Sequence, residues 1–130
     1  MAALHGEHIL VVEDEAKLAR LMKQLLEAFG FKVQTAGSGA EALTYATQER
    51  PDLVTLDLRL PDQDGFTVCR QLRQLYHSSV LPVVMVTAMD QPIDHLRGMA
   101  SGADAYLTKP YDSSELIQTI VTLLEQTATT

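Results

Sequence analysis

Asp57 ends a short segment, Leu53 to Asp57, that is otherwise apolar apart from a threonine. Burying an unpaired carboxylate costs more free energy than strand propensity returns, so an aspartate at this place indicates chemistry rather than packing. Pro61 and Gly65 follow, and they are typical of a loop that leads into a helix. We therefore expect Asp57 at the carboxyl end of a strand, where α/β sheets bind their ligands.

Other polar residues stand at equivalent points of the chain. Glu13 and Asp14 follow the first apolar run, Thr87 ends the fourth predicted strand, and Lys109 follows the fifth. In a parallel sheet the carboxyl ends of all strands face one edge, so these residues should converge on Asp57. The sequence thus predicts one cluster of three carboxylates, a hydroxyl and an amine.

This set of groups favours phosphoryl chemistry. Carboxylates at close range repel one another unless a cation intervenes. An oxygen-rich cluster of this kind suits Mg²⁺, which keeps several waters and takes one or two carboxylates. Lys109 and a divalent cation would together neutralise the three acids. Asp57 could then act as a nucleophile that forms an aspartyl-phosphate, with Lys109 facing the phosphoryl oxygens and Thr87 bonding the new group.

The elements that must position these residues alternate along the chain. Continuous apolar runs that suit buried strands are followed by segments with apolar residues every three or four positions, which predict amphipathic helices. Alternation of this kind predicts an α/β fold with a single doubly wound parallel sheet and right-handed crossovers. The predicted strands are Ile9 to Val12, Phe31 to Ala36, Leu53 to Asp57, Pro82 to Thr87 and Asp104 to Thr108. The predicted helices are Leu18 to Phe29, Ala40 to Glu49, Phe66 to Tyr76, Pro92 to Ala100, and a last one ending at Leu124.

Residue types at the helix ends and along the helix faces give finer expectations. Gly30 and Gly102 should end the first and fourth helices, and Ser113 or Ser114 should cap the last. Asp62 and Asp64 are interpreted as turn and cap residues. The apolar positions that mark the helical pattern of the first and fourth helices are Leu18, Leu21, Met22, Leu25, Leu26, Phe29, Ile93, Leu96, Met99 and Ala100.

Bulk composition limits the possible classes of protein. A chain of 130 residues with 46% apolar content fits one domain, 1–130, with a core over 8–125 and a polar tail at 126–130. We find no apolar segment long enough to span a membrane and no secretory signal, and expect a cytoplasmic protein. The only cysteine, Cys69, excludes an internal disulfide, and His95 and the other histidines lack metal-ligand spacing and are interpreted as surface residues. A net charge of −7 disfavours direct nucleic-acid binding.

Taken in this order, the motifs resemble a receiver (response-regulator) domain of two-component signalling over nearly everything from Ile9 to Leu124. They are Glu13-Asp14, Asp57-Leu-Arg-Leu-Pro-Asp-Gln-Asp-Gly65, Val86-Thr87-Ala88, and Gly102-Ala-Asp-Ala-Tyr106-Leu-Thr-Lys109-Pro110. The resemblance implies the flavodoxin-like fold of chemotaxis receivers, with five strands in the order 2-1-3-4-5 and five helices. It also implies a cis peptide bond at Lys109-Pro110.

The resemblance further assigns a role to each site residue. Asp57 would be the phosphoacceptor, and Lys109 would pair with its carboxylate and then with the phosphate. Thr87 would be the switch hydroxyl and Tyr106 the switch aromatic that turns inward on phosphorylation. The resemblance implies that Mg²⁺ would be bound by Glu13, Asp14, Asp57 and the backbone carbonyl of Arg59.

Partners follow from the same resemblance. A sensor histidine kinase or a phosphotransfer protein of a phosphorelay would supply the phosphoryl group. The signal would pass through the face formed by the fourth helix, fifth strand and fifth helix to a separate protein or a fused effector domain. Receivers that dimerise through this face commonly carry an aspartate and an arginine where this chain has Ala105 and Ser114, so its oligomeric state stays open and a dimer is one possibility.

Two other functions are alternatives to that of a receiver domain. One is a flavodoxin-like binder of a small cofactor. The acidic pair Glu13-Asp14 disfavours this function, because the pair stands where a glycine-rich phosphate loop would be needed. The other is a receiver-shaped interaction protein that works without phosphorylation. The acidic pair could also simply cap the first helix through Asp14, and Tyr106 could simply cover the flank of a helix. No enzymatic activity is expected beyond catalysis of its own phosphorylation and dephosphorylation.

Overall fold

The computed structural model describes residues 6–128 and has the predicted α/β architecture. Strands and helices alternate, and the five strands form one sheet in the order β2-β1-β3-β4-β5. The strands are β1 (His8–Val12), β2 (Lys32–Ala36), β3 (Leu53–Leu56), β4 (Val83–Thr87) and β5 (Ala105–Thr108). The helices are α1 (Ala16–Ala28), α2 (Gly39–Gln48), α3 (Gly65–Leu75), α4 (Pro92–Ala100) and α5 (Ser113–Ala128). Each of these elements lies within about four residues of its predicted bounds, and both fold class and strand order are confirmed.

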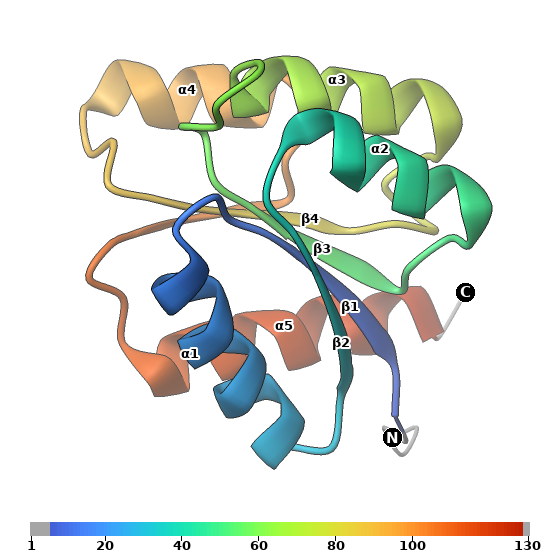
Figure 1. The fold of residues 1–130 in the computed structure, drawn as a ribbon. Helices are drawn as coiled ribbons and strands as arrows, with labels where there is room; N and C mark the ends of the chain where they lie inside the picture. The colour runs from blue at the N-terminus through green and yellow to red at the C-terminus, as the bar shows by residue number, and fades with distance from the viewer. Residues whose placement is uncertain (1–5, 129–130) are drawn as a thin grey trace.

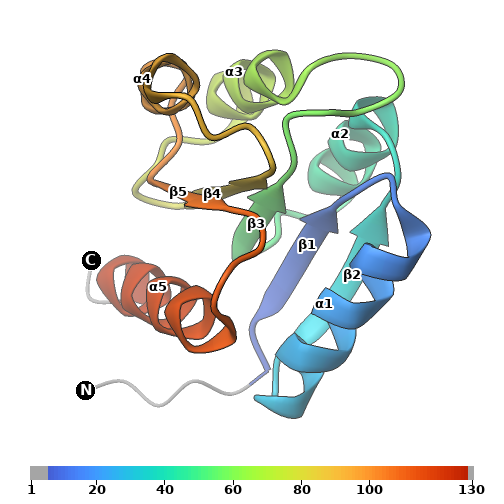
Figure 2. The same ribbon diagram turned by 90° about the vertical axis from the view of Figure 1, so that its left-hand side faces the viewer.

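The sheet is parallel throughout and is covered on both faces. Helices α2, α3 and α4 lie on one side, and α1 and α5 lie on the other (Figure 1). This arrangement explains why the central strands are apolar without alternation, since both faces of each strand are buried. Figure 2 looks onto the edge at which the strands end, where the loops that carry the polar residues gather.

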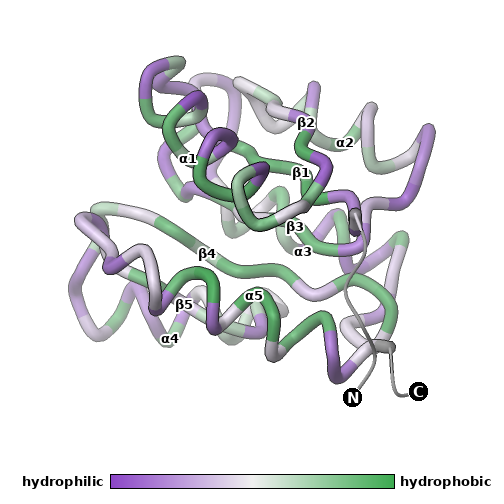
Figure 3. Tube along the Cα trace, turned by 90° about the horizontal axis from the view of Figure 1, so that it is seen from below, coloured by the Kyte–Doolittle hydropathy of each residue, from purple (hydrophilic) through white to green (hydrophobic). Residues whose placement is uncertain are grey.

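Two apolar layers flank the sheet. One packs β-strand side chains such as Leu56 and Met85 against α2 and α3, where Cys69 and Leu72 are fully buried. The other packs the opposite strand faces against α1 and α5, where Leu26 is fully buried. In Figure 3 the strands inside the molecule are largely green, while purple collects on the outer turns and loops. The strands β1, β3 and β4 that lead to the site are therefore buried along nearly their whole length.

Several helix boundaries follow the sequence signals, and one does not. Gly30 and Gly102 have positive φ angles of 92° and 113°, and Pro92 opens α4, as predicted. The prediction of a serine cap on α5 is wrong. The carboxylate of Asp112 accepts the amide of Ser114 at 2.8 Å and the amide of Glu115 at 3.3 Å, because it lies one residue before the first turn.

Part of the apolar pattern that marks the first and fourth helices lies on the surface. The exposed fraction is between 40% and 66% for Leu21 of α1, for Phe29 at its C-cap, and for Ile93, Leu96 and Met99 of α4. The short helix α4 buries only Asp94 and Gly98, because it rests on the edge strand β5 along a narrow stripe. Helical periodicity marks an apolar face but does not say how much of it another element covers.

The chain termini add two details. Helix α5 continues to Ala128, so the first residues of the expected polar tail are helical, and residues 129 and 130 lie outside the described part. Among residues 6–128, no helix is both long and apolar enough to cross a membrane.

Candidate functional site

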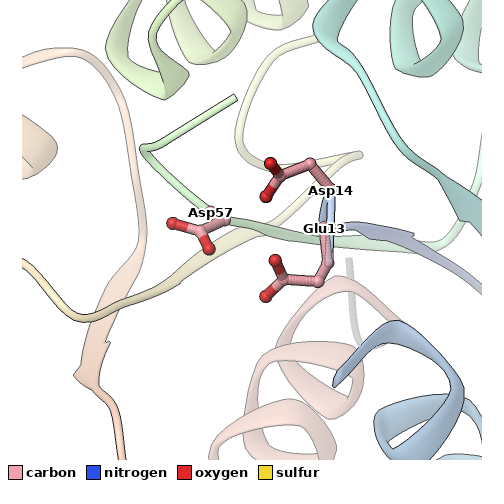
Figure 4. A group of neighbouring side chains, drawn as sticks. All are labelled: Glu13, Asp14 and Asp57. Atoms are coloured by element: carbon pink, nitrogen blue, oxygen red, sulfur yellow. The ribbon is translucent and has the colours of Figure 1, made fainter. Parts of the chain in front are cut away.

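The predicted site residues meet at the carboxyl edge of the sheet. Glu13 and Asp14 follow β1, and Asp57 follows the neighbouring strand β3. Each of the three carboxylates offers an oxygen within 4.8 Å of the others, and in Figure 4 they project in the same direction. Asp57 and Glu13 are only 6% and 7% exposed, whereas Asp14 is open to solvent. The convergence predicted from the sequence is thus present.

Lys109 completes the cluster from the end of the edge strand β5. Its ammonium group donates a hydrogen bond to Asp57 Oδ2 at 2.7 Å and another to Glu13 Oε1. Burial alone would lower the pKa of Lys109, but its bonds to the two carboxylates outweigh this and hold the pKa above its ordinary value. The peptide bond between Lys109 and Pro110 is cis, as the sequence resemblance implied.

Glu13 accepts hydrogen bonds from both Lys109 and the backbone before α1. Burial raises the pKa of its carboxyl group, and the hydrogen bond from Lys109 offsets only part of that rise. Its second oxygen accepts the amide of Glu15 at 3.2 Å, just before α1 begins. Within residues 6–128, Asp14 accepts no first-turn amide of α1, so it does not act as the helix cap considered above.

Asp57 is held by backbone as well as by Lys109. Its own amide donates to Val12 O at 3.0 Å, which extends the β1–β3 ladder past the strand end. Its Oδ1 accepts the amide of Arg59 at 3.1 Å, so the carboxylate and the start of the loop are oriented together. A Cβ at Gly65 would lie 2.5 Å from Asp57 O, which explains why a glycine stands there. Metal binding by the carbonyl of Arg59 stays a prediction.

The two expected switch residues lie behind this cluster. Thr87 is fully buried, and its Oγ1 accepts the amide of Met89 at 3.4 Å. Tyr106 is half-buried, and its hydroxyl donates to the carbonyl of Met89 at 2.6 Å. Both residues therefore contact the same short loop after β4. The inward turn of Tyr106 on phosphorylation stays a prediction.

Three contacts of Tyr106 are not predicted from the sequence. The ring of His95 stacks on the ring of Tyr106, with centroids 4.9 Å apart and planes 10° from parallel. A Cβ at Gly98 would lie 2.9 Å from the tyrosine ring, so this glycine makes room for it. The carbonyl of Met89 accepts the hydroxyl. No single-residue signal marks them, because each depends on how α4 packs against β5.

A cleft of ≈ 300 Å³ opens beside the cluster. It is lined by Glu13, Asp14, Glu15, Leu18, Asp57, Arg59, Ala88 and Lys109. Oxygen atoms bound to one Mg²⁺ at about 2.1 Å lie at most about 4.2 Å apart, so donors within 4.8 Å need only small adjustments. Their hard oxygen chemistry also matches this ion, and the residues present therefore fit it.

Comparisons with known proteins agree with this geometry. Residues 9–121 match the family model of the response regulator receiver domain. The chain is 43% identical over 119 residues to the DNA-binding dual master transcriptional regulator RpaA of Synechocystis, covering 92% of this chain and 49% of RpaA. It is 42% identical over 121 residues to the alkaline phosphatase synthesis transcriptional regulatory protein PhoP of Bacillus subtilis, covering 93% and 50%. The chain spans about half the length of these curated relatives.

Solved structures show the same similarity in three dimensions. A CheY-like receiver domain protein from Methanospirillum hungatei has a TM-score of 0.90 at 27% identity, covering 95% of this chain and 98% of that chain. The BeF3-activated N-terminal receiver domain of RstA from Klebsiella pneumoniae has a TM-score of 0.85 at 31% identity, covering 90% and 97%. These matches decide for the receiver over the flavodoxin-like cofactor binder.

Proposed function

The chain belongs to the response regulator receiver domains of two-component signalling, and on that premise we propose that Asp57 is the residue that accepts the phosphoryl group. An oxygen of the Asp57 carboxylate attacks the phosphorus of a phosphohistidine. The bond from phosphorus to nitrogen breaks, and the imidazole leaves with the electron pair and takes up a proton. The single observation that carries this proposal is the 2.7 Å bond from Lys109 to Asp57 inside the acidic cluster.

The neighbouring residues prepare the site for an incoming anion. Glu13, Asp14 and Asp57 would hold Mg²⁺, with the Arg59 carbonyl as a further ligand. When bound, this ion supplies positive charge for the phosphoryl oxygens and neutralises the acids. Lys109 already lies against Asp57 and can follow the phosphoryl group with one ammonium hydrogen while it retains Glu13 with another.

The signal would leave the site through Thr87 and Tyr106. A phosphoryl group on Asp57 would draw the Thr87 hydroxyl toward it, which would end the weak bond to the Met89 amide. Tyr106 bonds the carbonyl of the same residue, so a shift of this loop reaches β5 and α4. The exposed apolar side chains of α4, with Ile93 59% and Leu96 66% exposed, lie on the face proposed to meet a partner.

Partners are proposed by analogy with the relatives. A sensor histidine kinase or phosphotransfer protein would donate the phosphoryl group. RpaA and PhoP are transcriptional regulators about twice as long as the matched region. Residues 1–130 would act as the receiver unit and pass the signal either to a fused effector domain or to a separate protein.

The residues two positions beyond Asp57 and Thr87 are proposed to protect the phosphate. Arg59 is long, charged and exposed, and Met89 is apolar and partly buried against the core. Together they would limit the access of water to the aspartyl-phosphate. The double variant Arg59→Ala, Met89→Ala should lose its phosphate faster than the parent, and an unchanged decay rate would rule out this shielding.

Incubation with Mg²⁺ and a small acyl-phosphate donor tests the central proposal. Intact-mass spectrometry should show the gain of one phosphoryl group in the parent and none in Asp57→Asn. A parent that gains nothing, or an Asp57→Asn variant that gains as much, would exclude Asp57 as the acceptor.

A further inference from the structure

The loop between β3 and α3 is closed at its base. Arg59 and Asp64 form an isolated antiparallel bridge, and the amide of Gly65 donates to Leu58 O at 2.9 Å. Leu58 is 2% exposed, so the base is fixed to the core. Asp64 ends the loop by capping α3, because its Oδ1 accepts the amide of Thr67 at 2.8 Å. None of these contacts holds the tip of the loop.

The tip is tethered to a different helix. Asp62 Oδ1 accepts the amide of Gly39 at 2.9 Å, and Oδ2 accepts the amide of Ala40 at 2.9 Å. These amides belong to the first turn of α2, where backbone donors have no partners within the helix. The helix's own N-cap, Ser38, satisfies only the amide of Glu41, at 3.1 Å. Asp62 thus caps a helix that precedes it by more than twenty residues in sequence.

Close packing supports the same tether. A Cβ at Gly39 would lie 2.7 Å from Cγ of Gln63 and 2.8 Å from Cγ2 of Val68. The loop tip and the start of α3 therefore press against the first residue of α2 with no space between them. The amides of Gly39 and Ala40 also lower the pKa of Asp62, so its carboxylate is charged at neutral pH.

We propose that Asp62 is a positioning residue for the phosphorylation site, because it clamps the tip of the β3–α3 loop to α2. The same loop begins at Asp57 and carries Arg59, whose amide bonds Asp57 Oδ1 at 3.1 Å. A loop held at base and tip is ordered before any ion binds. A loop held only at its base must be ordered during binding, and that conformational entropy weakens the affinity. This inference rests on the proposed function of the Asp57 site.

Three variants separate positioning from helix stability. Asp62→Ala removes both amide contacts and frees the loop tip. Ser38→Ala removes the other cap of α2 and leaves the loop tip attached, so it is the matched control. Asp62→Asn keeps one acceptor oxygen and should fall between Asp62→Ala and the parent. Asp62 is exposed, so its substitution leaves the core intact.

The readouts are Mg²⁺ affinity by titration calorimetry and amide hydrogen exchange over residues 58–64 without metal. Loss of a group that orients metal ligands typically weakens affinity about 10- to 100-fold, and Asp62 acts one step further out. We expect Asp62→Ala to weaken Mg²⁺ binding by about three- to tenfold and to speed exchange in the loop. We expect Ser38→Ala to change the affinity by less than about twofold.

Two results would overturn the inference. Asp62→Ala could bind Mg²⁺ as tightly as the parent, or Ser38→Ala could weaken it equally, which would make Asp62 a support of α2 only. Neither result touches the proposed function, because that fails only if the parent shows no phosphorylation that depends on Asp57. The two failures are therefore distinguishable.

Discussion

At the scale of single residues, the site depends on one ammonium group between two buried carboxylates. Lys109 bonds Asp57 and Glu13 at once, and without it two acids of like charge would face each other at the end of neighbouring strands. The sequence predicted that Lys109 would pair with Asp57. It did not predict the second bond to Glu13, because that depends on the side-chain conformation rather than on strand order.

Removal of this ammonium group should slow phosphorylation. Lys109→Met keeps the apolar stem but loses the charge that would face the phosphoryl oxygens, and the loss of one such group costs at least about tenfold. The measurement is the initial rate of mass gain with an acyl-phosphate donor. Lys17→Met is a matched control, because Lys17 is exposed on α1. Equal rates in Lys109→Met and Lys17→Met would contradict the role of Lys109.

Glu13 should make the metal-free protein less stable at neutral pH. Burial raises its pKa in the folded state, so the stability that its protonated form contributes is present below the ordinary glutamate pKa and is lost as the pH rises through the raised value. Glu13→Gln should therefore raise Tm at pH 7 without Mg²⁺, and the gain should shrink toward pH 4. A lower Tm for Glu13→Gln at pH 7 would show that its bond to Lys109 outweighs the cost of burial.

At the scale of elements, the ends of helices decide how the loops are held. Sequence signals located the start of α4 at Pro92 and the ends of α1 and α4 at Gly30 and Gly102. They missed Asp112 as the cap of α5, because two adjacent serines are equally good cap residues by type. The exposed face of α4 was also missed, because coverage depends on neighbouring elements.

The cap on α5 gives a stability prediction with a defined pH dependence. Hydrogen bonds from the Ser114 side chain and from the amides of Glu115 and Ser114 lower the pKa of Asp112. An acid with a lowered pKa contributes stability above its ordinary pKa of about 3.9, and this contribution is lost as the pH falls through the lowered value. Asp112→Ala should therefore lower Tm at pH 7, with a difference that shrinks below about pH 4.

The control for this prediction is Ser113→Ala, which removes a hydroxyl from the same turn without removing the carboxylate. It should leave Tm nearly unchanged at both pH values. If Ser113→Ala lowered Tm as much as Asp112→Ala, the serine cap expected from the sequence would be right after all.

At the scale of the whole molecule, a parallel sheet is what brings the site together. Alternating strands and helices were enough to predict that Glu13, Asp57, Thr87 and Lys109 would meet at one edge. The tether from Asp62 to α2 could not be predicted in this way, because it joins a loop to the first turn of a helix, and their distance depends on the packing of α2 against α3. Long-range bonds from a side chain to backbone amides leave no periodic trace in the sequence.

Mg²⁺ should stabilise the folded chain as a whole, since the acidic cluster exists only when the sheet is formed. Binding to the folded state alone adds about 2.7 kcal/mol when free Mg²⁺ is 100 times Kd. Thermal unfolding should show a Tm that rises with MgCl₂ and not with NaCl at equal ionic strength. Asp14→Asn should reduce the rise, because it removes one of the three carboxylates. An equal rise in that variant would place the ion elsewhere.

The proposed phosphorylation places a covalent phosphoryl group on the carboxylate of Asp57, and this group can be located by chemical reduction. Borohydride reduces an acyl phosphate to an alcohol, so treatment of the phosphorylated protein converts an aspartyl-phosphate to homoserine. Peptide mass spectrometry should then find homoserine at position 57 and unmodified residues at Glu13 and Asp14. Homoserine absent from position 57 in protein that has gained a phosphoryl group, or a reduced side chain at another acidic residue, would exclude Asp57 as the acceptor.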